Sequence, residues 1–321
     1  MKRFAIMGVG GFIAPRHLDA VRDTGSELVA ACDPKDSVGV LDQYSFDVRF
    51  FTETERFDRH LERLRRGPRH ERLDYLSVCS PNYLHDAHCR LGLRAGVDVI
   101  CEKPVVINPW NVDALLDVER ETGRRVHPVL QLRLHDKIVA LRNRVLEERG
   151  VRHDVTLTYV TARGPWYDVS WKGNEEKSGG IPANIGVHIF DMLLWTFGPP
   201  QGFEVHLRDP RRWSGTLHLE RARVRWLLSV DAADLPVGST RSAFRAITID
   251  GTEIDFSDGF TALHTRAYES ILAGNGLSLA DARPAIDLVS RLRKLPRTEP
   301  GSERIHRKAG RAEAVNEKNG M

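Results

Sequence analysis

The feature that most constrains this chain is a glycine-rich turn that begins at residue 8. Residues 3–7 form a short apolar run typical of a buried strand, and Gly8, Gly10 and Gly11 follow it closely. Residues 13–24 then carry helical spacing. Glycines let a backbone approach a phosphate closely, and the start of a helix offers free N–H groups and the positive end of its dipole. A unit of strand, glycine turn and helix therefore predicts dinucleotide binding.

An acidic residue stands where such a unit needs one. The spacing departs from the plain G-x-G-x-x-G pattern and is better described as Gly8-x-x-Gly11-x-x-Ala14, with Gly10 as an extra small residue. Asp33 ends a second apolar run and is placed to bind ribose hydroxyls. Because a carboxylate repels a 2′-phosphate, Asp33 favours NAD over NADP. A tight turn that binds nothing is the alternative interpretation.

Strand-like and helix-like segments alternate through the first part of the chain. Strands are expected at 3–7, 27–32, 49–51, 75–79, 97–101 and 125–131, with helices at 13–24, 53–66, up to about 95, and 109–122. Alternation on this length scale predicts a doubly wound parallel sheet of the Rossmann type. Continuous apolar strands fit a sheet that is covered on both faces.

The rhythm changes after a helical stretch near 135–149. Strand-like runs follow one another at 153–161, 203–207, 213–220, 223–231, 244–250 and 253–256, before helices at 261–273 and 279–294. This order predicts an α+β domain built on a large, mostly antiparallel sheet. We expect an NAD-binding domain at 1–131, a substrate-binding and oligomerisation domain at 132–294, and a polar basic tail at 295–321. The second domain has few helices to cover its sheet, so one face is available for oligomerisation.

Composition excludes several classes of protein. Apolar residues make up 41% of the chain, and no apolar run reaches the roughly 20 residues of a membrane helix. The four cysteines form no Cys-x-x-Cys pair, which indicates reduced, buried thiols and no metal site. A net charge of +3 from arginines spread along the chain gives little support to nucleic-acid binding. With no secretory signal evident, we expect a cytoplasmic protein that binds no membrane.

Two strand ends carry polar motifs. Ser80-Pro81-Asn82-x-x-His85 follows the fourth expected strand, and Glu102-Lys103-Pro104 follows the fifth. Ligands of open α/β sheets lie beyond the carboxyl ends of the strands, so both motifs would face a ligand. Taken alone, Lys103 is better explained as a surface lysine in a turn, with Pro104 stopping the strand.

Together these motifs resemble the Gfo/Idh/MocA family of oxidoreductases in their order and spacing. The stretch 179–191, GGIPANIGVHIFD, is similar to that family's G-G-x-x-x-D-x-G-x-H-x-x-D pattern. The resemblance implies NAD as cofactor and Lys103 and His188 as catalytic residues, either of which could be the base. Asn184 stands where many members have Asp, and an amide can neither act as a base nor strengthen one. Asp191 either orients His188 or packs structurally. The implied NAD contacts are Gly8, Gly11, Phe12, Ile13, Asp33, Ser37, Ser80, Pro81, Asn82, His85, Glu102, Lys103 and Gln131.

Basic and aromatic residues at the start of the second half narrow the substrate. Arg133, Arg163, Lys172 and Lys177 suit a substrate with several negative charges, although Lys172 and Lys177 could instead pair with surface acids. The run 11–17, GFIAPRH, and Asn184 resemble one branch of the family, the UDP-N-acetylglucosaminuronate 3-dehydrogenases of bacterial surface-polysaccharide (lipopolysaccharide or O-antigen) synthesis. That branch implies a homotetramer and NAD-dependent oxidation of a UDP-sugar uronate at C3. The implied substrate contacts are Lys103, Arg133, Arg163, Tyr167, Lys172, Asn184 and His188.

Three alternatives remain open at this stage. The chain could be another sugar or polyol dehydrogenase of the same family, with the same fold and a different substrate. It could be a non-catalytic NAD-binding regulator, although the presence of both Lys103 and His188 argues against that function. It could also be an interaction protein that acts through the basic tail, but the tail lacks the interleaved aromatic residues expected of a nucleic-acid binder.

Overall fold

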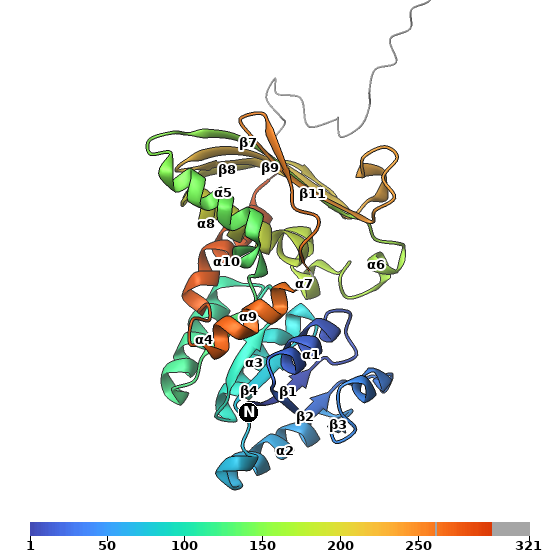
Figure 1. Ribbon diagram of the computed structural model, residues 1–321. Coiled ribbons are helices and arrows are strands. Elements are labelled where there is room, and N and C mark those ends of the chain that lie inside the picture. Colours follow the sequence, from blue (N-terminus) through green and yellow to red (C-terminus); the bar gives the residue numbers. More distant parts are fainter. Residues whose placement is uncertain (261, 297–321) are drawn as a thin grey trace, which may run out of the picture.

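The computed structural model describes residues 1–260 and 262–296 and contains two six-stranded sheets (Figure 1). The first has the strand order β3-β2-β1-β4-β5-β6 and is parallel throughout. The second has the order β12-β11-β7-β10-β9-β8. The predicted fold class, a Rossmann sheet followed by an α+β half, is confirmed. Nearly all of the predicted tail lies outside the described residues.

The first sheet is formed by the apolar runs expected from the sequence. Its strands are β1 (Arg3–Met7), β2 (Glu27–Cys32), β3 (Arg49–Phe51), β4 (Tyr75–Val78), β5 (Asp98–Cys101) and β6 (Val126–Pro128). The helices of this half are α1 (Ala14–Asp23), α2 (Thr54–Arg66), α3 (His85–Arg94) and α4 (Pro109–Thr122), with short 3₁₀ turns at Gly39–Gln43, Arg69–Glu71, Asn82–Leu84 and Gln131–Leu134. The central strands β1 and β4 are almost fully buried, because helices cover both faces of a parallel sheet.

The second sheet is mixed. Its strands are β7 (His153–Thr161), β8 (Pro200–Arg208), β9 (Arg212–Leu219), β10 (Ala222–Ser229), β11 (Ala243–Ile249) and β12 (Thr252–Asp255). Neighbouring strands are antiparallel except β10 and β7, which run parallel. The sheet is therefore mostly antiparallel, as predicted. A short 3₁₀ turn, Ala232–Asp234, follows β10.

Helices of the second half lie between this sheet and the Rossmann half (Figure 1). They are α5 (Asp136–Glu147), α6 (Trp166–Val169), α7 (Glu175–Ser178), α8 (Val187–Phe197), α9 (Leu263–Leu272) and α10 (Leu279–Lys294). The core of this layer includes Phe190 of α8, whose ring lies 5.3 Å from that of Trp226 on β10. Helix α8 packs against both α5 and α10.

Helices α9 and α10 follow the second sheet in sequence but contact the Rossmann half. Helix α9 packs on α1, and α10 packs on α4 and β6. The last two helices of the chain therefore pack as part of the Rossmann half. This contact brings His264 beside His17 of α1, a proximity that the sequence order does not suggest.

Two segments differ from the sequence prediction. The strand expected at 125–131 is only three residues long and gives way to the 3₁₀ turn at Gln131–Leu134. The helix α8 was not predicted, because Val187–Phe197 is buried on nearly all sides and has no polar stripe to mark its period. It follows a short π-helical turn, Pro182–Gly186, in the same buried stretch.

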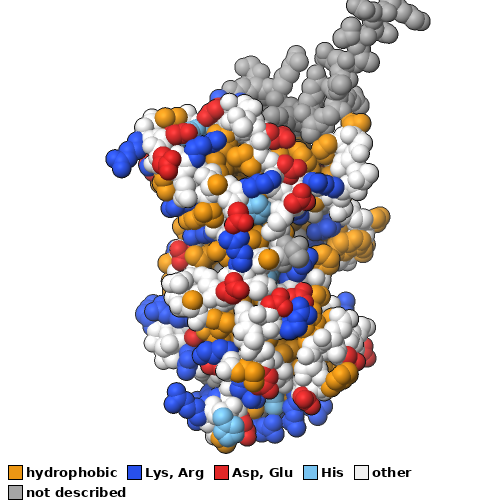
Figure 2. Space-filling model, in the orientation of Figure 1, with side chains coloured by type: hydrophobic (Ala, Val, Ile, Leu, Met, Phe, Trp, Pro, Cys, Tyr) orange, Lys and Arg blue, Asp and Glu red, His pale blue; other side chains and the backbone are white. Residues whose placement is uncertain are grey.

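The surface carries mixed charge over the face shown in Figure 2, where basic, acidic and apolar side chains are interspersed. None of the helices among the described residues has both the length and the apolar composition required of a membrane span.

Candidate active site

The glycine turn approaches the end of β4 so closely that its first position admits no side chain. Gly8 has a φ of +84°, and a Cβ there would lie 2.5 Å from the backbone nitrogen of Ser80. The Gly8 N–H donates to the carbonyl of Cys32 at 2.8 Å, which ties the turn to the end of β2 as well. The turn therefore lies where three strand ends meet, at the edge that binds ligands in sheets of this kind.

Asp33 is held by the turn itself. Its Oδ2 accepts a hydrogen bond from the N–H of Gly10 at 2.9 Å, and its Oδ1 accepts one from the N–H of Lys35 at 2.9 Å. Gly10 is thus more than an extra small residue. A Cβ at Gly10 would lie 3.2 Å from the carboxylate, so a side chain there would push Asp33 away from this position.

Helix α1 begins without a side-chain cap. Its N-cap residue, Ile13, makes no side-chain hydrogen bond within the described residues, and its first turn contains Pro15 and no acidic residue. The N–H of Ala14 donates to the carbonyl of Gly11 at 3.2 Å and that of Arg16 to the carbonyl of Ile13 at 3.0 Å, and Pro15 has no N–H. The start of the helix therefore offers an anion the positive end of its dipole rather than free N–H groups. Phe12 beside it is 86% exposed. The glycine cradle, the positive end of the α1 dipole and the oriented Asp33 carboxylate together fit the pyrophosphate and ribose of NAD.

The polar residues of the strand-end turns shape this edge through the backbone. His85 places one ring nitrogen 2.7 Å from the carbonyl of Pro104 and the other 2.7 Å from that of Ser80. Asn82 donates to the carbonyl of Ser178 at 2.8 Å. Ser80 pairs with His88, Pro81 precedes the 3₁₀ turn, Ser37 is exposed in the loop after Asp33, and Gln131 is buried.

Lys103 and His188 belong to one buried centre. The Lys103 Nζ donates to the carbonyl oxygen of Asn184 at 2.9 Å, and the Lys103–Pro104 peptide bond is cis. Asn184 lies in the π-helical turn, four residues before His188, and its side-chain amide donates to the hydroxyl of Tyr167 at 3.2 Å. The His188 ring lies 5.6 Å from that of Tyr159, and neither of its nitrogens has a hydrogen-bond partner among the described residues.

The environment changes how both groups hold protons. Burial lowers the pKa of Lys103 to about 8; Lys172, Arg163 and Arg245 act in the same direction, and Glu102 opposes them. Burial also holds the pKa of His188 well below its usual value, and the Lys103 charge adds to this effect. At neutral pH His188 is therefore a neutral imidazole, while Lys103 is close enough to its pKa to gain or lose a proton.

A group of cations surrounds this centre. Burial lowers the pKa values of Arg163 and Lys172, and each cation adds to the effect on its neighbours. The Lys172 ammonium lies 5.0 Å from the Trp171 ring centroid, and Arg245 lies 5.1 Å from that of Tyr159. Within residues 1–260 and 262–296, none of the three cations has an acidic hydrogen-bond or ion-pair partner. The sequence prediction missed Arg245, because only the pairing of β11 with β7 places it opposite Tyr159.

Arg133, a predicted substrate contact, is paired with carboxylates and so differs from the three cations of this group. Its guanidinium makes two hydrogen bonds to the carboxylate of Asp191, at 2.9 and 2.6 Å, and a third to the Asp281 carbonyl at 3.0 Å. Asp191 therefore pairs with Arg133 rather than orienting His188. Lys177 lies over the ring of Tyr83 at 5.6 Å, and the neighbouring Glu175 pairs with Arg208 instead of a lysine.

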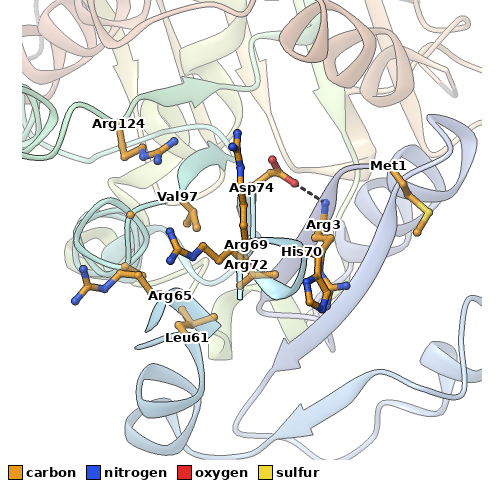
Figure 3. A pocket seen from close by; sticks show the side chains of 13 residues that line it. Met1, Arg3, Leu61, Arg65, Arg69, His70, Arg72, Asp74, Val97 and Arg124 are labelled. Carbon is orange, nitrogen blue, oxygen red and sulfur yellow. Dashed lines mark hydrogen bonds between the residues drawn. The ribbon is translucent and has the colours of Figure 1, made fainter. Parts of the chain in front are cut away.

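A separate cavity of about 730 Å³ lies at the opposite edge of the Rossmann sheet (Figure 3). It sits at the amino ends of β1, β4 and β5, whereas ligands of such sheets bind at the carboxyl ends. Its arginines are exposed, apart from Arg3, which pairs with Glu27. We therefore do not assign the reaction to this cavity. Its lining includes Arg3, Arg65, Arg69, His70, Arg72, Asp74 and Arg124.

The carboxyl edge of the parallel sheet suits a dinucleotide, and Lys103 and His188 lie together in one centre. This combination defines a two-domain, nicotinamide-dependent oxidoreductase. The family model described as "Oxidoreductase family, NAD-binding Rossmann fold" matches residues 2–129, and that described as "Oxidoreductase family, C-terminal alpha/beta domain" matches residues 150–231. The chain belongs to the Gfo/Idh/MocA family of oxidoreductases.

Solved structures of high similarity support this assignment. The WlbA (WbpB) dehydrogenase from Thermus thermophilus, in complex with NAD and α-ketoglutarate, is 47% identical with a TM-score of 0.91, and the match covers 94% of this chain and 98% of that one. The same enzyme in complex with NAD and UDP-GlcNAcA is 46% identical with a TM-score of 0.91, over 96% and 99% of the two chains.

Curated relatives match over a shorter span. D-glucoside 3-dehydrogenase from Escherichia coli is 33% identical over 133 residues, which is 40% of this chain and 36% of that protein. The chain thus spans about a third of the length of the first curated relatives that it matches. These matches support the family and leave the substrate to be argued from the site.

Proposed function

We propose that this protein is an NAD-dependent dehydrogenase that oxidises the C3 hydroxyl of UDP-N-acetyl-D-glucosaminuronate to the 3-keto sugar. The observation that carries the proposal is the group of cations without acidic partners around Lys103. A UDP-sugar uronate brings a diphosphate and a carboxylate, which are the anions that arginine and lysine bind best. The Thermus enzyme binds NAD and UDP-GlcNAcA and shares this chain's fold over nearly its full length.

Lys103 is the better candidate for the base. A general base works best when its pKa lies near the operating pH, and the pKa of Lys103 is about 8. Neutral Lys103 would take the proton of the C3 hydroxyl, while His188 holds the same oxygen by a hydrogen bond. Asn184 gives no charge that would strengthen His188 as a base. The bound NAD supplies the hydride acceptor.

The other polar groups bind and orient. Arg163, Lys172 and Arg245 would hold the carboxylate and phosphates, with Tyr167 and Asn184 holding the sugar. Asp33 would accept hydrogen bonds from the ribose and favour NAD over NADP. The remaining predicted contacts along the glycine turn and the strand ends stay part of this proposal, but Arg133 does not.

The test is NADH formation from a panel of substrates. UDP-N-acetylglucosaminuronate should be oxidised with a kcat/KM far above those of UDP-N-acetylglucosamine, myo-inositol and D-glucosides. The pH profile should rise with an apparent pKa near 8. Preference for an uncharged sugar or polyol would contradict the proposal and favour another dehydrogenase of the family, and NAD binding without any turnover would favour a regulator.

Reoxidation of the cofactor requires a second substrate, and the comparison offers a candidate. The Thermus enzyme was solved with NAD and α-ketoglutarate, a dianion that also suits the cations of this site. We propose α-ketoglutarate as the second substrate, reduced to 2-hydroxyglutarate as NADH returns to NAD. With catalytic amounts of NAD, turnover of the uronate should require added α-ketoglutarate, and 2-hydroxyglutarate should form in equal amount.

The last part of the proposal concerns the oligomeric state, the compartment and the biosynthetic role. We propose a homotetramer that acts in the cytoplasm on a sugar precursor of lipopolysaccharide, O-antigen or another bacterial surface polysaccharide. The face of the second sheet opposite α8 is the proposed interface between subunits, and residues 1–131 and 132–294 are the proposed domains. Leu227 lies on that face beside Thr158, so Leu227→Glu should lower the mass measured by light scattering. An unchanged mass would place the interface elsewhere.

A further inference from the structure

Glu102, so far considered only as a predicted NAD contact, lies at the centre of a buried group of polar side chains. Its Oε1 accepts a hydrogen bond from Nε2 of His17 at 3.1 Å and another from Nε2 of His264 at 2.8 Å. Its Oε2 accepts one from the backbone N–H of Lys103 at 3.1 Å. We call His17, Glu102 and His264 the Glu102 cluster; their exposed fractions are 0, 6 and 3%.

A chain of hydrogen bonds from Ser77 through Tyr268 to His17 has one consistent assignment of donors and acceptors. Nδ1 of His17 lies 2.8 Å from the hydroxyl of Tyr268, which lies 2.6 Å from the hydroxyl of Ser77. If both histidines donate from Nε2 to Glu102, then Ser77 donates to Tyr268 and Tyr268 donates to His17. Nδ1 of His264 has no partner in the described part of the chain, and a bare acceptor is the less costly state for it.

These hydrogen bonds hold Glu102 in its ionised form. Burial alone would raise the pKa of Glu102, but the hydrogen bonds from His17 and His264 outweigh burial and hold that pKa well below its usual value. Burial lowers the pKa of His17, which keeps its imidazole neutral. A buried carboxylate without donors would instead take up a proton.

Distant parts of the chain supply these donors. His17 comes from α1, while His264 comes from α9, which follows the second sheet and returns to pack on α1. Glu102 directly follows β5 and immediately precedes Lys103. The Glu102 carboxylate thus connects α1, the turn that carries Lys103, and α9.

We propose that Glu102, held ionised by His17 and His264, is a positioning residue that fixes the turn carrying Lys103 and sets a negative charge against its ammonium. The proposal rests on the proposed function only for the role of Lys103 in turnover. Its structural content is a fixed backbone and a fixed charge, and both can be measured without substrate.

The charge balance at Lys103 states what Glu102 does there. Lys172, Arg163 and Arg245 favour the neutral amine, and Glu102 favours the ammonium. Without Glu102, Lys103 would be neutral at lower pH. The titratable or charged groups that face Lys103 or the cluster are Glu102, His17, His264, His85, His188, Lys172, Arg163, Arg245, Tyr268, Cys79 and Cys101.

The experiment follows the pH dependence of Lys103 acylation in the full-length protein with NAD bound. A trace of acetic anhydride labels neutral amines, and mass spectrometry measures the label on Lys103. In the wild type the midpoint should lie near pH 8, and Glu102→Gln should lower it by on the order of one pH unit. His264→Leu should lower it by less, and adding His264→Leu to Glu102→Gln should cause no further shift if His264 acts through Glu102.

Two controls separate positioning from general damage. His153 is also buried and pairs with Asp250, but it lies at the end of the second sheet, so His153→Leu should leave the Lys103 midpoint unchanged even where stability falls. His264→Gln keeps a donor and should restore the midpoint. If Glu102→Gln does not fold, the comparison of His264→Leu with His264→Gln carries the test.

Three results would overturn the proposal: an unchanged midpoint in a folded Glu102→Gln protein, equal effects of His264→Leu and His153→Leu, or a bound metal. The cluster's ligand atoms lie within 4.8 Å of one another, so metal analysis of the purified protein belongs in the test. One equivalent of metal per chain would replace the negative charge by a positive one. A shifted midpoint in a protein that oxidises no uronate would keep this proposal and reject the proposed substrate.

Discussion

The cofactor side and the substrate side of the candidate active site treat their polar groups in opposite ways. On the cofactor side, Asp33 accepts two hydrogen bonds from backbone N–H groups. Glu102 accepts three hydrogen bonds, two from histidine side chains and one from a backbone N–H. On the substrate side, Arg163 and Lys172 have no acidic partners and His188 has no hydrogen bond among the described residues. The cofactor side is thus preorganised by the protein itself. The substrate side keeps positive charge that an anionic ligand would neutralise.

The largest effect should come from the residue at which the two sides meet. Lys103→Met removes the proposed base and the ammonium that faces Glu102, so kcat for the uronate should fall by about 10²–10⁴-fold. NAD affinity, measured by calorimetry, should change little, because the glycine turn and Asp33 remain intact. Normal turnover in both Lys103→Met and His188→Ala would reject this assignment of the chemistry.

The cofactor side is best broken at Gly8. Gly8→Ala adds a Cβ that would lie 2.5 Å from Ser80 and puts alanine in the left-handed region. The backbone strain costs roughly 1–2 kcal/mol of stability, and relief of the close contact would displace the turn that approaches the phosphates, so NAD affinity should fall about tenfold or more. Gly123 has a φ of +68° with nothing within 4 Å, which makes Gly123→Ala the matched control. Gly123→Ala should lower stability and leave NAD affinity unchanged, and equal losses of affinity would contradict the prediction.

The substrate side is best tested at Arg163. Arg163→Gln removes a charge-assisted contact worth about 1.5–3 kcal/mol, so KM for the uronate should rise about 10–100-fold while KM for NAD stays constant. It also removes a cation that lowers the pKa of Lys103, so the rise in the pH profile should move to higher pH. Arg212 pairs with Asp231 and Asp234, and Arg212→Gln should change neither quantity.

The sequence predicted the fold and one side of the site better than the other. The glycine turn, Asp33 and the strand-end motifs are local in sequence, and a strand–turn–helix unit leaves them few possible positions. Lys103 and His188 were identified through resemblance rather than physics, since each alone is better explained structurally. The structure places both beside Asn184, and whether they react as proposed is for the variants to decide.

What the sequence did not predict depends on contacts between distant segments. Arg245 lies beside Tyr159 through the pairing of β11 with β7, and His264 reaches Glu102 because α9 returns to pack on α1. Neither residue has a local pattern that marks it. The ion pairs of Arg133 were not predictable for the same reason, because its carboxylate partners lie on α8 and α10.

Arg133 gives the last and smallest expected effect on catalysis. Arg133 directly follows the predicted cofactor domain in sequence and carries the charge that an anionic substrate needs. Its guanidinium is already paired with Asp191 and Asp281. Arg133→Met should therefore lower thermal stability, since breaking a buried ion pair costs about 3–5 kcal/mol. KM for the uronate should stay within about twofold, because substrate gains nothing from a cation already neutralised. Arg133→Met with Asp191→Leu should recover stability, since no buried charge is left unpaired. If Arg133→Met instead raised KM as much as Arg163→Gln does, a paired cation would be binding substrate, and the contrast between the two sides would fail.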